Sequence, residues 1–218
     1  MIKKAAISII IVIAGYFIYT KLLTAGEHIE KDKARWETYF KDVQPAEKVS
    51  KWLLPFKVND RADRRNFSVI STFGAHRNSY VRGHKHTGID CIPKPKVDGA
   101  AVYAMAEGVV CSIHLDDPHR TVVVRHNTAG GDEIFSSYKH LGDIYVENGQ
   151  QVDHDTKLAR LYTGAEAREL GGNYDHLHLE IRKKFDDFGC ASWATMNKEE
   201  LNERFYDPLK FIKENIGK

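Results

Sequence analysis

The stretch His176-Leu177-His178-Leu179-Glu180-Ile181 alternates polar and apolar side chains. Successive side chains of a β-strand point to opposite faces of its sheet, so this period of two predicts a strand. The apolar side chains are expected to face a hydrophobic core, while both histidines and the glutamate line the opposite face. Two histidines on one strand face can supply two groups to a metal site. A solvated strand face would show the same pattern.

Other short β-rich runs precede this stretch, at a spacing of about ten residues. They cover residues 101–104, 109–113, 121–124, 133–138 and 158–162. Gly, Asp and Asn residues separate the runs, as at Asn148-Gly149. No helical pattern lies between them, which predicts a mainly β fold with an antiparallel core. The tail, residues 197–215, is expected to be helical around Pro208.

The amino-acid composition excludes several classes of protein. The chain has 218 residues, 42% of them hydrophobic and 28% charged, which suits one globular domain with a small appendage. A net charge of +2 gives no electrostatic footprint for nucleic acid. The three cysteines form neither a disulfide framework nor a C-x-x-C zinc pair. Of the 11 histidines, 10 lie between His76 and His178, and this density points to metal or proton chemistry.

The amino terminus predicts a membrane location. Lys3 and Lys4 precede an apolar run that extends to Ala25 with Lys21 as its only charged residue. As a helix this run would be roughly 31 Å long, enough to cross the hydrocarbon core of a bilayer. Residues 1–25 are therefore expected to form a signal anchor, with the two lysines in the cytoplasm and the remaining chain outside it. A cleaved signal peptide, which would make the protein secreted, is the alternative.

Apolar residues recur at helical spacing between residues 26 and 60. They are Ile29, Trp36, Phe40 and Val43, followed by Val49, Trp52, Leu53 and Phe56. Pro45 would end the first of these helical segments. The expected organisation is thus an anchor over residues 1–25, a helical juxtamembrane stalk over 26–60 and the β domain over 61–218.

Two further motifs carry side chains that could bind a metal ion or transfer protons. His86-Thr87-Gly88-Ile89-Asp90 places an imidazole and a carboxylate four residues apart, and Tyr138-Lys139-His140-Leu141 places a histidine at a strand end. A catalytic zinc site needs three protein ligands, an open position and groups that transfer protons. His86, Asp90 and one of His176 and His178 would supply the ligands. The remaining strand histidine and His140 would then transfer protons.

The order H-x-G-x-D, Y-x-H-L, H-L-H resembles the lysostaphin/LytM family of zinc metallopeptidases, which cut peptides of bacterial peptidoglycan. Further family motifs are similar to Ser71-Thr72-Phe73-Gly74, residues 102–110, residues 146–152 and Asp207-Pro208-Leu209. The resemblance implies that His86, Asp90 and His178 bind one zinc ion. It implies that His140 and His176 are the catalytic pair, and that the fold is a compact antiparallel β-sheet domain with a groove over one sheet. The implied activity is hydrolysis of a stem-peptide or cross-bridge bond of peptidoglycan.

Two inserts depart from the family pattern, at residues 165–175 and 185–205, and the first is expected to reshape one rim of the groove. Asp175 also stands where the family usually has proline. The alternative function is a catalytically silent LytM-like protein that binds or activates another cell-wall hydrolase. Such relatives typically lose metal ligands, whereas all five chemical residues are present here.

Residues outside these motifs receive no catalytic role. Four histidines in β runs or polar turns are expected to be solvated: His114, His119, His126 and His154. Cys91 and Cys111 are expected to be buried free thiols.

Overall fold

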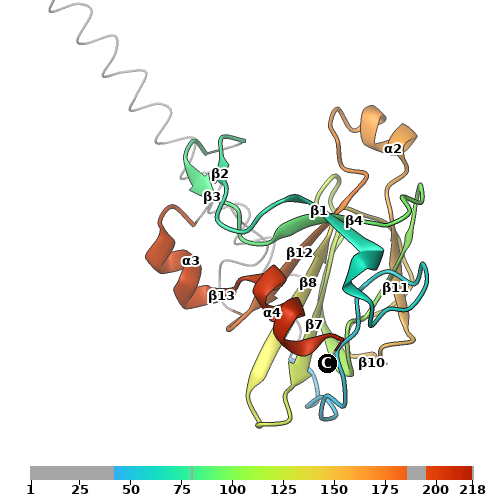
Figure 1. Ribbon diagram of the computed structural model, residues 1–218, viewed down its shortest axis with the longest axis vertical. Coiled ribbons are helices and arrows are strands. Elements are labelled where there is room, and N and C mark those ends of the chain that lie inside the picture. Colours follow the sequence, from blue (N-terminus) through green and yellow to red (C-terminus); the bar gives the residue numbers. More distant parts are fainter. Residues whose placement is uncertain (1–41, 80, 186–194, 218) are drawn as a thin grey trace, which may run out of the picture.

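The computed structural model describes residues 42–79, 81–185 and 195–217 (Figure 1). The anchor predicted over residues 1–25, the first part of the predicted stalk, and Cys190 and Trp193 of the second insert lie outside these residues. Within the described part of the chain, no helix is both long enough and apolar enough to cross a membrane.

Antiparallel strands make up most of the described chain, which confirms the predicted mainly β fold (Figure 1). The largest sheet has the order β1 (Phe67–Ser71), β4 (Ile89–Pro93), β12 (Leu177–Arg182), β8 (Glu133–Lys139), β7 (Thr121–Asn127), β6 (Gly108–His114) and β10 (Gln151–Val152), and β13 (Phe205–Tyr206) pairs with β12. The smaller sheets are β5 (Ala101–Tyr103), β11 (Lys157–Leu161) and β9 (Leu141–Ile144), and the hairpin of β2 (His76–Arg77) and β3 (His84–Lys85). The described helices are η1 (Arg64–Asn66), α2 (Gly164–Glu169), α3 (Lys198–Arg204) and α4 (Pro208–Asn215).

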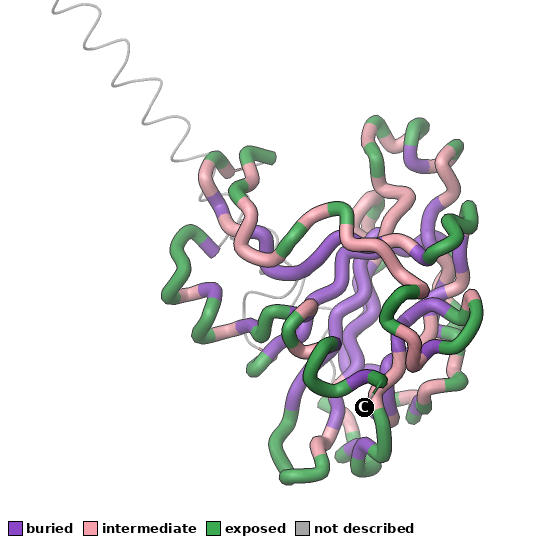
Figure 2. The backbone as a smooth tube through the Cα atoms, in the orientation of Figure 1, coloured by how far each residue is buried: buried purple, intermediate pink, exposed green. Residues whose placement is uncertain are grey.

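The core lies against one face of strand β12. Leu177, Leu179 and Ile181 are all 0% exposed, and Tyr138 of β8 packs in the same apolar cluster. Figure 2 shows these central strands as the buried middle of the molecule. The alternation of residues 176–181 is therefore that of a strand with one face in the core. Cys91 and Cys111 are buried free thiols, as the sequence predicted.

The predicted helical tail is confirmed as two helices, α3 and α4, separated by strand β13. Asp207 caps α4 by accepting hydrogen bonds from the backbone of Leu209 and Lys210, and Pro208 occupies the first turn. Proline suits this position because its missing N–H would have no partner within the helix. Ile212 of α4 is fully buried, which joins the tail to the core.

The helical stalk predicted over residues 26–60 is wrong for its described part, because residues 42–60 contain no helix. This segment is extended along the domain and makes single bridges from Lys48 to Asn127 and from Phe56 to Val102. Leu54 and Phe56 are 0% and 1% exposed and belong to the core. Tertiary packing of the apolar side chains, rather than helical periodicity, explains their spacing.

His126 of β7 lies at the centre of a buried polar network beneath this segment. Its Nδ1 lies 2.7 Å from the Glu107 carbonyl and its Nε2 lies 2.7 Å from Ser136 Oγ. Ser136 in turn contacts the Tyr138 hydroxyl, and Trp52 packs edge-on against the imidazole. The expectation that His126 is solvated is therefore wrong. His114 is also buried, at 2% exposure.

We expect His126 to weaken the fold in acid. Burial lowers the pKa of this imidazole from 6.5 to about 4, so between these pH values the unfolded chain binds a proton that the folded chain does not. Stability contributed by the neutral residue is complete above pH 6.5 and is lost as pH falls towards 4. The expected loss is about 3 kcal/mol.

Urea unfolding of the parent chain and of His126→Gln at several pH values between 7.5 and 4 tests this expectation. Glutamine retains hydrogen-bonding groups but does not titrate. The variant is expected to be less stable at pH 7.5 and to lose less stability in acid. Equal pH dependence of the two chains would contradict the assignment.

Candidate metal centre and catalytic cleft

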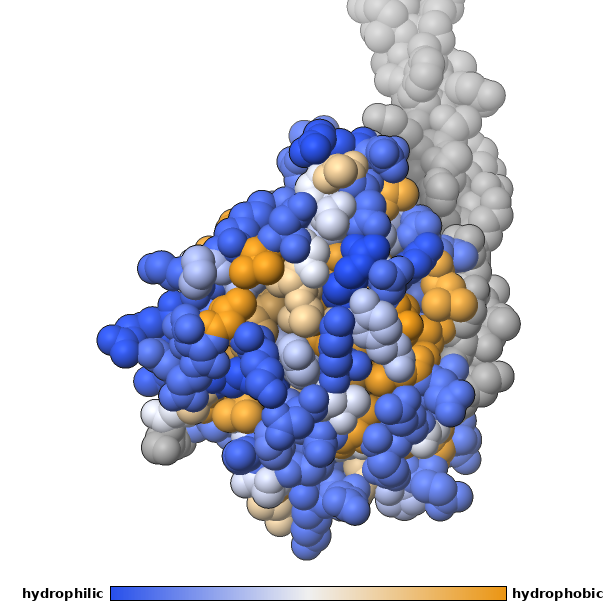
Figure 3. Space-filling model, turned by 90° about the vertical axis from the view of Figure 1, so that its right-hand side faces the viewer, coloured by the Kyte–Doolittle hydropathy of each residue, from blue (hydrophilic) through white to orange (hydrophobic). Residues whose placement is uncertain are grey.

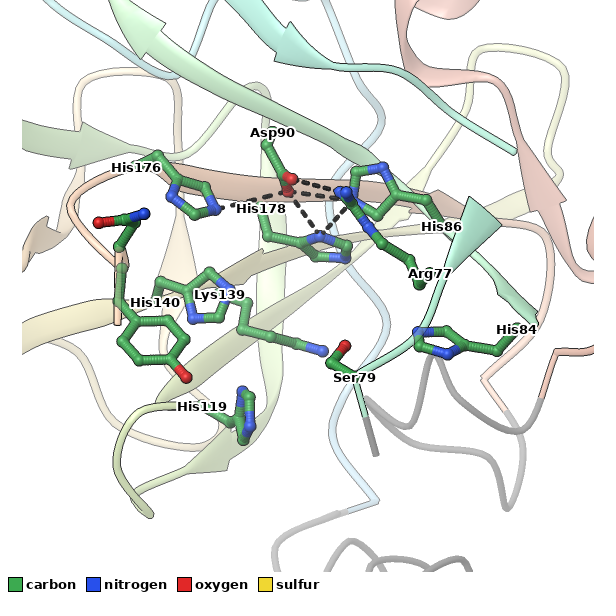
Figure 4. A pocket seen from close by; sticks show the side chains of 12 residues that line it. Arg77, Ser79, His84, His86, Asp90, His119, Lys139, His140, His176 and His178 are labelled. Atoms are coloured by element: carbon green, nitrogen blue, oxygen red, sulfur yellow. Dashed lines mark hydrogen bonds and ion pairs between the residues drawn. The ribbon is translucent and has the colours of Figure 1, made fainter. Parts of the chain in front are cut away.

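Three buried side chains converge at the edge where β4 meets β12. Asp90 of β4 is the register partner of His178 of β12, and His86 immediately follows β3. The His86 Nε2 atom lies 3.0 Å from Asp90 Oδ1 and 2.9 Å from His178 Nδ1, and the last two atoms are 3.1 Å apart (Figure 4). The three ligands predicted from the sequence thus offer one atom each to a common point.

Gly88 allows this convergence. A Cβ atom at this position would lie 2.3 Å from the Leu179 carbonyl oxygen, which is closer than real Cβ contacts approach. The absence of a side chain lets the backbone between His86 and Asp90 lie directly against β12. Glycine is therefore required at this position of the H-x-G-x-D motif, because any side chain would collide with β12.

Each of the three side chains has an outer partner that orients it. His86 Nδ1 donates to the Thr72 carbonyl over 2.8 Å, and Arg77 donates to Asp90 Oδ2 over 2.5 Å. His178 Nε2 lies 3.0 Å from Glu180 Oε1. These contacts leave His86 Nε2, Asp90 Oδ1 and His178 Nδ1 directed at one another.

The donor set fits zinc. Ligand atoms bound to a tetrahedral zinc ion lie roughly 3.4 Å apart, and two imidazoles with one carboxylate leave a fourth position open. Burial opposes ionisation of Asp90, but the close contacts of its carboxyl group with His176, His178 and His86 outweigh burial and hold its pKa well below the usual range. The carboxylate is therefore ionised at neutral pH and can act as a ligand.

His140 lies at the end of β8 and has a backbone φ of 69°, which is uncommon outside glycine. Its Nδ1 donates to the Pro118 carbonyl over 2.8 Å. Burial, followed by the neighbouring His176 and His178, holds its pKa well below 6.5. The imidazole is therefore neutral at pH 7, with Nε2 as its unprotonated nitrogen.

His176 lies between His140 and the predicted metal ligand Asp90. Its ring centroid is 5.0 Å from that of His140, and its Nε2 is 3.6 Å from Asp90 Oδ1. All five residues predicted from the sequence thus line one cleft of about 230 Å³ (Figure 4). The structure brings every member of the predicted set together.

The same cleft contains residues that sequence reasoning missed. They are Arg77, Ser79, His119, Lys139, Asn173 and Tyr174. The rings of Tyr174 and His119 lie 5.1 and 5.6 Å from that of His140. Neither has a local motif that marks it, and the expectation that His119 is solvated outside the site is wrong.

The first insert forms a wall of the cleft, which agrees with the expectation that it reshapes the rim. Residues 164–169 form α2, whose Glu166 pairs with both terminal nitrogens of Arg160 over 2.7 Å. Asp175 at the other end pairs with Lys96 over 2.6 Å. These anchors hold Tyr174 beside His140. The face that carries β11 and α2 is otherwise largely hydrophilic, with scattered apolar side chains (Figure 3).

A family model and several solved structures are similar to this chain. The model of peptidase family M23 matches residues 84–190. The catalytic domain of the antimicrobial peptidase lysostaphin from Staphylococcus simulans is 18% identical, with a TM-score of 0.47, over 68% of this chain and 94% of that one. LytU is 21% identical, with a TM-score of 0.46, over 77% of this chain and 94% of that one. A complex of SpoIIIAH and SpoIIQ gives 22% identity and a TM-score of 0.45, over 75% of this chain and 99% of that one.

No curated protein matches the chain. The segment matched by the family model runs from β3 past β12 and contains all five residues that converge on the cleft. This match confirms the resemblance to the lysostaphin/LytM-type peptidases, and the segment of residues 84–190 belongs to peptidase family M23.

Proposed function

We propose that this chain is a zinc metalloendopeptidase that hydrolyses peptide bonds of bacterial peptidoglycan, in the stem peptide or the cross-bridge. The observation that carries the proposal is the convergence of His86 Nε2, Asp90 Oδ1 and His178 Nδ1 beside His140 and His176 in one cleft. A metal centre alone would suit a structural site. Two further histidines at its open side supply the proton transfers that hydrolysis requires.

The chemistry of the proposed reaction divides between the ion and the side chains. Zinc in such a site acidifies a bound water and polarises the scissile carbonyl. His140 Nε2 accepts a proton from the attacking water, because its Nδ1 proton is held by the Pro118 carbonyl. His176, on the other side of the cleft, stabilises the charge that develops on the carbonyl oxygen and donates a proton to the leaving amine.

The alternative, a catalytically silent relative that binds or activates another hydrolase, requires the reacting groups to be absent or misplaced. Here the two histidines lie with their ring centroids 5.0 Å apart at the ligand cluster. This placement favours an active enzyme.

The test is digestion of purified peptidoglycan by the zinc-loaded, full-length chain, followed by mass measurement of the products. Release of peptides with newly formed amino and carboxyl termini is expected, and their masses identify the bond cut. A chelated sample of the same protein serves as the control. Zinc binding without any product would contradict the enzyme and favour the silent alternative.

We also propose that the β domain lies outside the cytoplasm, tethered by residues 1–25. Two lysines before an apolar run support this orientation, and the substrate would be located there. Protease treatment of intact spheroplasts should degrade the domain while inside-out vesicles protect it. The reverse pattern would contradict the orientation.

A further inference from the structure

A fully buried carboxylate, Glu180, lies beside His178 on strand β12. It is 0% exposed, and its Oε1 lies 3.0 Å from His178 Nε2. An ionised carboxylate only accepts hydrogen bonds, so Nε2 is the nitrogen that donates and carries the proton. In the neutral imidazole, Nδ1 is then unprotonated, and this is the atom that faces Asp90 and His86.

Two partners hold Glu180 in this position. The hydroxyl of Thr87, a residue of the H-x-G-x-D motif, donates to the same Oε1 atom. The guanidinium of Arg182 lies 3.3 Å from Oε2, and its side chain is only 2% exposed. Thr87 directly follows His86. The Glu180 carboxylate therefore links β12, which carries His178, to the segment that carries His86 and Asp90.

Stability alone does not explain this arrangement. Removing two charges from water costs free energy that their attraction often fails to recover, so a buried ion pair is weak evidence for stabilisation. Outer partners of metal-binding histidines, in contrast, fix the ring orientation and the tautomer, and their loss typically weakens metal binding by about 10–100-fold.

We propose that Glu180 is a positioning residue that holds His178 with Nδ1 directed at the metal position, and that Thr87 and Arg182 hold Glu180. This inference rests on the proposed metal centre and adds the residues that preorganise it.

The first measurement is the nitrogen NMR spectrum of the His178 ring in the zinc-free, full-length chain. The parent protein is expected to show the tautomer protonated at Nε2. Glu180→Leu combined with Arg182→Met removes the carboxylate without leaving an unpaired buried charge, and is expected to show a mixture of tautomers. A purely structural role for Glu180 would leave the tautomer unchanged.

The second measurement is zinc affinity by competition with a chelator. The double variant is expected to bind zinc about 10–100-fold more weakly than the parent. Ser137→Ala is the matched control, because Ser137 is the register partner of Glu180 on β8, is equally buried, and its hydroxyl makes no hydrogen bond within the described residues. This variant is expected to retain the parent affinity and tautomer.

A folded double variant with parent zinc affinity and a single Nε2-protonated tautomer would overturn the inference. If the double variant does not fold, Thr87→Val tests the role of Glu180 instead, because it removes one hydrogen-bond donor to Glu180 Oε1 with little change in volume. A severalfold weaker zinc affinity supports the role of Glu180, and an unchanged affinity overturns it. Failure of the parent chain to bind zinc would instead contradict the proposed function, while the tautomer measurement would still test the role of Glu180.

Discussion

Asp90→Ala is expected to abolish stoichiometric zinc binding. The carboxylate supplies the only negative charge among the three converging ligands, and its Oδ1 lies within 3.1 Å of both ligand nitrogens. Without it, two imidazoles would remain, and the guanidinium of Arg77 would lose its 2.5 Å contact inside the cleft. Both changes disfavour a divalent cation, so we expect metal content to fall from one equivalent to near zero.

His178→Ala is expected to have the same effect for a different reason. The strand would keep its register, but the Nδ1 ligand would be lost and the buried Glu180 carboxylate would lose its contact with the ring. Metal analysis after dialysis against limiting zinc measures the loss for both variants. His154→Ala, a histidine whose side chain lies near Glu107 and Asp155, is the control and should retain full zinc content. One equivalent of zinc in either ligand variant would contradict the assignment.

The sequence correctly predicts a strand where the local alternation of apolar and polar residues matches the burial of each strand face in the folded domain. In residues 176–181 the period of two is imposed by a core on one face and the cleft on the other, so it could be read without the structure. Residues 49–56 misled the prediction because apolar residues spaced three and four apart also occur in an extended segment whose side chains enter the core at irregular points. Leu54, which is fully buried, does not belong to the helical pattern at all.

The cleft likewise combines residues that a local motif marks with partners that only tertiary packing brings near. His86, Asp90, His140, His176 and His178 belong to short motifs with recognisable spacing, and the structure brings all of them together. The partners that orient His86 and His140 could not be predicted. The carbonyls of Thr72 and Pro118 carry no side-chain signal, and they meet the histidine rings only because distant segments pack together. Local sequence specifies the reacting groups, whereas tertiary packing specifies the tautomers of His86 and His140.

His140→Ala is expected to retain zinc and to lose hydrolysis. The His140 ring lies outside the converging ligand atoms, with its centroid 6.2 Å from that of His178, so its removal should leave one equivalent of zinc bound. A positioned acid or base typically contributes about 10²–10⁴-fold to a rate, and we expect kcat on purified peptidoglycan fragments to fall by that factor. His154→Ala again serves as the control and should keep both zinc and activity.

The backbone of His140 makes a second variant necessary. Its φ of 69° lies in the left-handed region, where alanine is disfavoured and asparagine is better tolerated. Loss of activity in His140→Ala could therefore follow from movement of the strand end rather than from loss of the imidazole. His140→Asn keeps a side chain that suits this backbone but cannot accept a proton near neutral pH. An equal loss of kcat in both variants, with zinc retained, assigns the effect to the imidazole, whereas parent activity in His140→Asn would remove His140 from the mechanism.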